Sequence, residues 1–206
     1  MERKDSAKKD NVKSVIIILV VVGVIVGGCF LLSFFGGDGL AKDEDQIAEQ
    51  LTVVQELLLR ADYKEYPTTP VQVLKYYNDI TTCFYNEEYT DSELDQLAIL
   101  ARTLFDRDLI LYQTQEEYLE KLREDIIEFE LQYDGIYRYE VTPANDVEYF
   151  TYEDYECARL YCTYTLKSGT GYIFSKEVFI MRKDEDGHWR IFGFDLVEDN
   201  EKEDEG

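Results

Sequence analysis

The residues that could carry acid–base or nucleophilic catalysis are few in this chain of 206 residues. The only histidine, His188, directly follows Gly187 in an acidic turn signal, where a side chain is usually exposed. A nucleophile needs a base within hydrogen-bond reach, and no Ser/His/Asp set can be built without His188. The sequence therefore predicts no catalytic residue, and we expect the protein not to be an enzyme.

Three aspartates near the C-terminus, Asp184, Asp186 and Asp195, could offer oxygen ligands to calcium. They do not follow the twelve-residue loop pattern of an EF-hand, and turns favour aspartate for its hydrogen bonds to nearby amides. The cysteines show no zinc spacing such as C-x-x-C. We expect no metal and no cofactor.

Three of the four cysteines, Cys83, Cys157 and Cys162, lie in the part of the chain that follows residue 36. On one strand, Cys157 and Cys162 would point to opposite faces about 16 Å apart, so they could not bridge each other. A disulfide between Cys83 and Cys162 is conceivable, but an odd number of cysteines is a poor disulfide framework. We expect buried, free thiols.

The chain contains 17 tyrosines, many of them in its C-terminal third. They could line a pocket or a recognition face for sugars or peptides, because each combines an apolar ring with a polar hydroxyl. Tyrosine is also a favoured strand residue that bridges core and water, so an ordinary structural role is the alternative. The candidates are Tyr139, Tyr149, Tyr161, Tyr164 and Tyr172, with Tyr152 and Tyr155 near them in sequence.

Capping boxes predict three helix starts between residues 69 and 117, because a threonine and a later Gln or Glu can satisfy the free amides. An amphipathic helix over 43–60 precedes them, and the run 109–111 is a helix end or a buried loop. The boxes pair Thr69 with Gln72, Thr90 with Glu93, and Thr114 with Glu117.

After Gly135 the apolar pattern changes from helical to alternating, which predicts strands. Turn signals at 167–171 and 184–187 join the last three of them. The predicted strands are 136–141, 147–151, 157–166, 172–183 and 188–197. Helices followed by an antiparallel meander are typical of an α+β fold, here with three to four helices on a curved sheet and a pocket between the layers.

An uncharged apolar segment begins at Ser14 and ends at Phe35. As a helix it would reach about 33 Å, enough to cross a bilayer core of about 30 Å. The basic residues before it indicate a cytoplasmic N-terminus and a C-terminal domain outside the cell membrane. The expected organisation is a basic segment 1–13, a transmembrane helix 14–35, a glycine-rich linker 36–42, an extracytoplasmic α+β domain 43–197 (helical over 43–132, a sheet over 136–197) and an acidic, frayed tail 198–206.

Two features of this apolar segment leave alternatives open. Residues 25–29 resemble a bacterial lipoprotein signal ending in Cys29, although the segment stays apolar beyond that cysteine. Gly23 and Gly27 have the spacing at which two spanning helices approach closely, so a homodimer is also open.

The formal net charge of −23 repels nucleic acid and anionic lipid surfaces. We therefore expect no nucleic-acid partner. The expected partners are the lipid bilayer, through residues 14–35, and an unidentified protein of the cell envelope.

Several segments carry a resemblance to known proteins. Residues 178–196, VFIMRKDEDGHWRIFGFDL, look like the last two strands of the nuclear transport factor two-like fold, a cone of helices on a curved sheet. Three longer segments are YPTTPVQVLKYYNDITTCFYNEEYTDSEL (66–94), DVEYFTYEDYECARLYCTYTL (146–166) and EVFIMRKDEDGHWRIFGFDL (177–196). In these segments the chain resembles an uncharacterised family of single-pass membrane proteins from anaerobic Gram-positive bacteria, a domain of unknown function. The resemblance implies an extracytoplasmic, cone-like domain on the wall side of the membrane.

Two classes of function remain. The lone histidine and the lack of paired acid–base residues favour a non-catalytic interaction or scaffold module of the envelope, an architecture also used by scaffold subunits of conjugative secretion machines. The alternative is a small-ligand-binding protein or an enzyme that uses the cone pocket. Convergent polar groups inside the pocket would favour the alternative, and packed aromatic rings would favour the scaffold.

Overall fold

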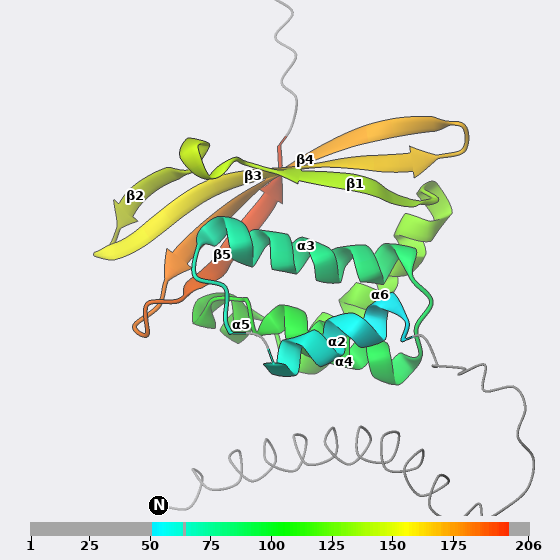
Figure 1. The fold of residues 1–206 in the computed structure, drawn as a ribbon, viewed down its shortest axis with the longest axis horizontal. Coiled ribbons are helices and arrows are strands. Elements are labelled where there is room, and N and C mark those ends of the chain that lie inside the picture. Colours follow the sequence, from blue (N-terminus) through cyan, green and yellow to red (C-terminus); the bar gives the residue numbers. More distant parts are fainter. Residues whose placement is uncertain (1–50, 64, 198–206) are drawn as a thin grey trace, which may run out of the picture. The chain divides into compact units, whose positions relative to one another are not determined.

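The computed structural model describes residues 51–63 and 65–197. Helices cover one face of an antiparallel sheet, which confirms the predicted α+β class (Figure 1). Five helices are present in these residues, more than the three to four predicted, because the run 109–111 belongs to a short helix of its own. They are α2 (Val53–Tyr63), α3 (Pro70–Asn86), α4 (Asp91–Arg102), α5 (Arg107–Tyr112) and α6 (Gln115–Gln132).

The helix starts follow the predicted caps. The Thr69 hydroxyl accepts from the Gln72 amide, and complete capping boxes open α4 at Thr90 and α6 at Thr114. The helix expected over 43–60 begins, within the described residues, only at Val53. Thr52 and Gln55 form reciprocal backbone–side-chain hydrogen bonds of 3.2 Å there, which is the geometry of a further capping box.

Removal of the cap on α6 is expected to weaken the fold. In Thr114→Ala the Glu117 amide loses its acceptor at 3.2 Å, so the free energy of unfolding should fall by about 1 kcal/mol. Urea unfolding of the full chain in dodecyl maltoside, followed by fluorescence of the single tryptophan Trp189, measures this change. Thr170→Ala, in an exposed turn, is the control and should stay within about 0.5 kcal/mol of the wild type; an equal loss in both variants would contradict the capping role.

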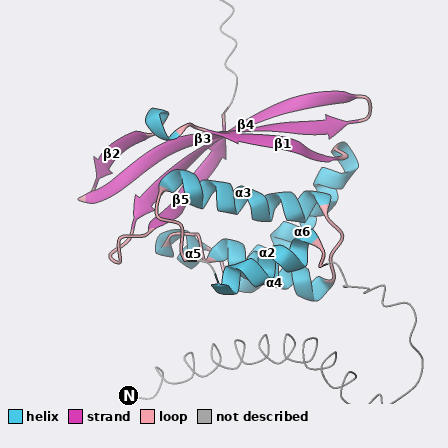
Figure 2. Ribbon diagram, viewed as in Figure 1, coloured by secondary structure: helices cyan, strands magenta, loops and turns pink. Residues whose placement is uncertain are grey.

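The sheet has the order β1–β3–β4–β5, and β2 also pairs with β3. All of these pairings are antiparallel (Figure 2). The strands lie where the alternating pattern predicts them: β1 (Gly135–Val141), β2 (Glu148–Tyr152), β3 (Tyr155–Ser168), β4 (Gly171–Lys183) and β5 (Trp189–Leu196).

Alternation along the long strands β3 and β4 separates an inner face, toward the helices, from an outer face. Leu160, Cys162 and Tyr164 lie on the inner face of β3 and are buried. Helix α3 lies along this face in Figure 1, with α2 and α4 beyond it. The core between the layers is apolar, and its largest fully buried members include Leu74, Ile80, Leu97, Leu104, Leu160, Phe179, Met181 and Ile191.

The edge of β5 is covered by the loop between α4 and α5. The Asp106 amide donates to the Ile191 carbonyl at 2.8 Å, and the Ile191 amide donates to the Leu104 carbonyl at 2.8 Å. Residues 104–106 therefore extend the sheet by a short parallel bridge. An exposed strand edge is a template for aggregation, and this loop removes that edge at Ile191.

The three described cysteines are buried and free, as predicted. Burial raises the pKa of the Cys83 thiol to about 11 and that of Cys162 to about 12. The thiolate is the reactive form, so these cysteines are inert at neutral pH and serve as small apolar core residues.

Within the described residues, no helix is long and apolar enough to cross a membrane. The predicted span 14–35, with Gly23, Gly27 and Cys29, lies outside the described part of the chain, as do the linker 36–42 and the tail 198–206.

Candidate functional site

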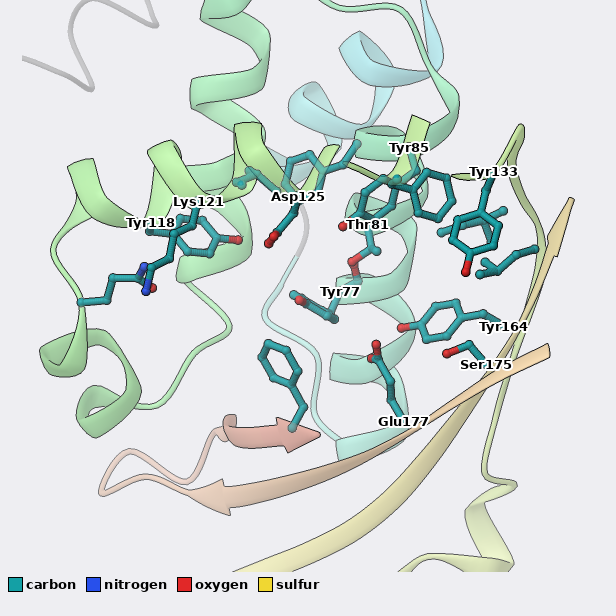
Figure 3. Close-up of a pocket in the computed structure, with 17 residues that line it drawn as sticks. Tyr77, Thr81, Tyr85, Tyr118, Lys121, Asp125, Tyr133, Tyr164, Ser175 and Glu177 are labelled. Atoms are coloured by element: carbon teal, nitrogen blue, oxygen red, sulfur yellow. The ribbon is translucent and has the colours of Figure 1, made fainter. Parts of the chain in front are cut away.

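A cavity of about 450 Å³ lies between the inner face of the sheet and helices α3 and α6 (Figure 3). Its walls are partly aromatic, but polar groups enter it from both layers. Helix α3 contributes Tyr77 and Thr81, α6 contributes Tyr118, Lys121 and Asp125, and the sheet contributes Tyr164, Ser175 and Glu177.

The secondary structure explains this convergence. Residues four apart share a face of a helix, which aligns Tyr77, Thr81 and Tyr85 along α3. On β4, Ser175 and Glu177 are two apart and both face inward. The strand register places Ser175 opposite Tyr164 and Glu177 opposite Cys162.

Glu177 is the most unusual group of the cavity. Burial raises its pKa from 4.5 to about 6, and a hydrogen bond with the Tyr164 hydroxyl opposes part of that rise. Among the described residues, no Lys or Arg lies within salt-bridge distance of its carboxylate. A half-buried carboxylate without a cationic partner is unfavourable for stability, and such groups are concentrated at functional sites.

The Tyr164 hydroxyl cannot satisfy this carboxylate fully. It carries one proton and also lies 2.5 Å from Oδ1 of the buried Asn78, to which it donates. Asn78 also accepts from the Cys162 thiol at 3.6 Å and donates to the Leu74 carbonyl at 2.8 Å. Asn78 is therefore fixed by its own partners and competes with Glu177 for the tyrosine proton.

Loss of this hydroxyl is expected to shift the titration of Glu177 further upward. In Tyr164→Phe the hydrogen bond that lowers the pKa of Glu177 is gone, while the burial that raises it remains, so the pKa should rise above about 6. A carboxyl-carbon NMR titration of the full chain measures this. Tyr161→Phe, on the outer face of the same strand, is the control and should leave the pKa unchanged; a lower value in Tyr164→Phe would contradict the assigned contact.

The tyrosines of the cavity are neutral hydrogen-bonding groups. Burial raises the pKa of Tyr85 to about 12 and that of Tyr77 well above its ordinary value of 10.0. Their rings also form walls: Tyr85 lies 4.2 Å from Phe129, and Tyr77 lies 6.2 Å from Phe194, measured between ring centroids. The amide nitrogen of Gln113, another residue of the wall, is buried without a hydrogen-bond partner among the described residues.

The structure does not gather the five tyrosines singled out from the sequence. Only Tyr164 lines the cavity. The Tyr139 hydroxyl donates to Asp79 at 2.7 Å on the surface of α3, and Tyr149 packs 5.9 Å from Trp189.

The other two tyrosines lie on the outer face of the sheet. Lys176 lies 4.6 Å above the ring of Tyr161, and Tyr172 lies 5.0 Å from Tyr137. The tyrosines that do line the cavity come from α3 and α6, apart from Tyr164 and Tyr133. One sequence signal could have indicated the site: Glu177 lies at an inward position of β4, two residues before the buried apolar Phe179 and four before Met181.

A second cluster, Asp184, Asp186 and His188, has potential ligand atoms within 4.8 Å of one another. Asp184 accepts from the amides of Asp186 and His188, at 3.1 and 2.8 Å, and from Arg190 Nε at 2.8 Å. Its carboxylate therefore organises the β4–β5 turn and neutralises Arg190. Asp195 is not part of this cluster, because it pairs with Val178 near the other end of β5. His188 does not line the cavity.

The helix-covered sheet and its polar cavity define an α+β domain with an internal pocket. The chain belongs to the family described as a domain of unknown function, DUF6715, whose model matches residues 1–194. A comparison with curated proteins finds no match. The resemblance to an uncharacterised family is thereby confirmed.

Proposed function

We propose that this domain binds a small organic ligand in the cavity between α3, α6 and the sheet, without catalysing a reaction on it. The observation that carries the proposal is Glu177, a carboxylate with no Lys or Arg within salt-bridge distance among the described residues, on the wall of a cavity large enough for an organic molecule. Convergent polar groups were the feature expected of a ligand-binding pocket, and they come here from both layers. His188, at the β4–β5 turn, takes no part.

Co-purification tests this proposal. The full chain is extracted from its own membrane in dodecyl maltoside, and the bound small molecules are identified by mass spectrometry. In Ser175→Phe a ring would occupy the cavity, so we expect a small molecule that is enriched with the wild type and lost from this variant. Thr163→Phe adds the same ring to the outer face and should retain the molecule. Equal small-molecule content in the wild type and both variants would contradict the proposal.

We further propose that residues 14–35 anchor the domain in the cell membrane of a Gram-positive bacterium, with the N-terminus in the cytoplasm and the domain outside. The apolar length and the basic residues of 1–13 support this topology. The arrangement of helices on the sheet also supports assignment to the cone-like, nuclear transport factor two-like class. Protease added to intact, wall-stripped cells should digest the domain, whereas full protection would contradict the topology.

A second candidate function, as an interaction module of the envelope, is favoured by the outer face of the sheet. Apolar side chains there are exposed: Phe174 by 69%, Tyr137 by 63% and Tyr172 by 53%. Exposed apolar patches of this kind often bind proteins. Crosslinking in the native membrane should trap a partner that Phe174→Glu releases and Tyr112→Glu, on α5, retains; no difference between these variants would contradict the role of this face.

A further inference from the structure

The cavity that we propose as a ligand site is negatively charged. Glu177 enters it from the sheet and Asp125 enters it from α6, and both carboxyl groups point toward Tyr77 (Figure 3). Among the described residues, neither carboxylate has a Lys or Arg within salt-bridge distance. Among the described residues, Lys121 is the one Lys or Arg in the wall; it lies one turn before Asp125 on α6 and lowers the pKa of that carboxyl in part. Two carboxylates against one ammonium leave the wall with a net negative charge, which attracts a positive ligand.

The surroundings strengthen this field. Glu124 and Glu128 flank Asp125 on α6 and, after burial itself, raise its pKa. The helix carries seven acidic and two basic side chains between Gln115 and Gln132. Clefts of one charge sign concentrate ligands of the opposite sign and accelerate their association.

The aromatic walls suit a cation that is organic. The face of an aromatic ring attracts an ammonium group within about 6 Å, and quaternary ammonium ligands are bound by cages of such rings. Rings of Tyr77, Tyr118, Tyr164 and Phe194 line the same cavity as the two carboxylates. The raised pKa values of these tyrosines keep their hydroxyls neutral, so they add no competing charge.

An inorganic cation fits the cavity less well. A divalent ion such as calcium takes six to eight oxygen ligands at 2.3–2.6 Å in general. Within the described residues, the one group of three or more potential metal ligands that converge is Asp184, Asp186 and His188, which is not in the cavity. The volume of about 450 Å³ is instead that of a small organic ligand site.

We infer that the ligand of this cavity is a small organic cation, an amine or quaternary ammonium compound, held between Glu177 and Asp125 with its apolar groups against the tyrosine and phenylalanine rings. The inference rests on the proposed function and specifies the charge of its ligand. Glu177, half-buried on the sheet, forms the inner ion pair with the cation, and Asp125, which is exposed on α6, forms the outer one.

Three probes that share a tert-butyl shape test which ligand charge the cavity prefers. Choline is the cation, 3,3-dimethyl-1-butanol is its uncharged carbon isostere, and 3,3-dimethylbutanoate is the anion. Each is titrated by saturation-transfer NMR into the full chain in dodecyl maltoside, with empty micelles as the blank. We expect choline to bind the wild type at least about tenfold more tightly than the neutral isostere, and the anion to bind most weakly.

Glu177→Gln should lower the affinity for choline at least about tenfold and should change the affinity for the neutral isostere by less than about twofold. Glu140→Gln, on the outer side of β1, should change none of the three affinities. Equal binding of choline and its isostere, a preference for the anion, or unchanged choline binding in Glu177→Gln would overturn the cation inference.

The same titrations separate this inference from the proposed function. If the neutral or anionic probe binds best and is lost in Ser175→Phe, the cavity is a ligand site of a different charge preference. If none of the three probes binds in a way that depends on Ser175, both the cation inference and the binding function are contradicted.

Discussion

Replacement of Asp106 by alanine is expected to lower the free energy of unfolding by about 3–5 kcal/mol, since it would leave the Arg182 guanidinium buried without its main partner. Arg182 Nε donates to Asp106 Oδ2 at 2.8 Å, and a second guanidinium nitrogen donates to Oδ1, so the pair is bidentate. The side chains are only 4% exposed for Asp106 and 13% for Arg182.

The position of this pair explains the size of the effect. Asp106 also caps α5, accepting from the Asp108 amide at 2.9 Å, and its own amide holds the edge of β5. The Arg182 guanidinium lies 4.7 Å from the ring centroid of Tyr155 and 4.5 Å from that of Phe192. The pair therefore joins the outer face of the sheet to the α4–α5 loop.

Asp108→Ala is the matched control. Its carboxylate lies 2.7 Å from the same guanidinium but is 59% exposed, so its loss should cost less than about 1 kcal/mol. Urea unfolding of the full chain, followed by Trp189 fluorescence, compares the two variants. A loss in Asp106→Ala no larger than that in Asp108→Ala would show that burial does not strengthen this pair.

Glu177→Gln is expected to stabilise the domain at pH 8 by up to about 2 kcal/mol, because ionised Glu177 is held in a place that disfavours its charge. Its pKa is raised from 4.5 to about 6, so the folded protein binds this proton more tightly than the unfolded chain. Stability therefore falls as the pH rises from about 4.5 to about 6. The glutamine variant avoids this loss, and its advantage should be absent below pH 4.5 and complete above pH 6.

Urea unfolding at pH 4 and pH 8 measures the difference. Glu140→Gln is the control, because that carboxylate is 64% exposed and lies 3.3 Å from Arg138. It should change stability by less than about 0.5 kcal/mol at both pH values. A gain in Glu177→Gln that is the same at both pH values would mean that the charge of Glu177 is not the cause. A gain seen only at high pH would fit a residue kept for binding at the expense of stability.

The sequence predicts the local elements well because their signals are local. Thr90 and Thr114 mark the starts of α4 and α6, because each belongs to a capping box that spans only four residues. Alternating apolar residues predict the strands. The glycine at position 187 predicts a turn, and there the backbone has a positive φ of 82°, which glycine adopts freely. The short helix α5 gives no such pattern, since six residues are too few to show a helical period.

The cavity could not be predicted in the same way. It depends on α6 and β4 lining the same space, although Asp125 and Glu177 are far apart in sequence, and no local pattern determines that arrangement. Tyr149, Tyr161 and Tyr172 lie away from the cavity. Tyrosine is common on strands for structural reasons, so its presence there does not by itself indicate a site. Glu177 was the informative residue, because an acid at an inward strand position is unfavourable for stability without a partner.

The measurement that bears most directly on the binding function is a fragment screen by ligand-observed NMR on the full chain in dodecyl maltoside. Ser175→Phe, with the cavity filled, is compared with the wild type and with Thr163→Phe, and native Trp189 fluorescence shows that each variant is folded. We expect fragments that bind the wild type and Thr163→Phe alike and bind Ser175→Phe at least about tenfold more weakly. If no fragment distinguishes Ser175→Phe from the wild type, the cavity is not a ligand site.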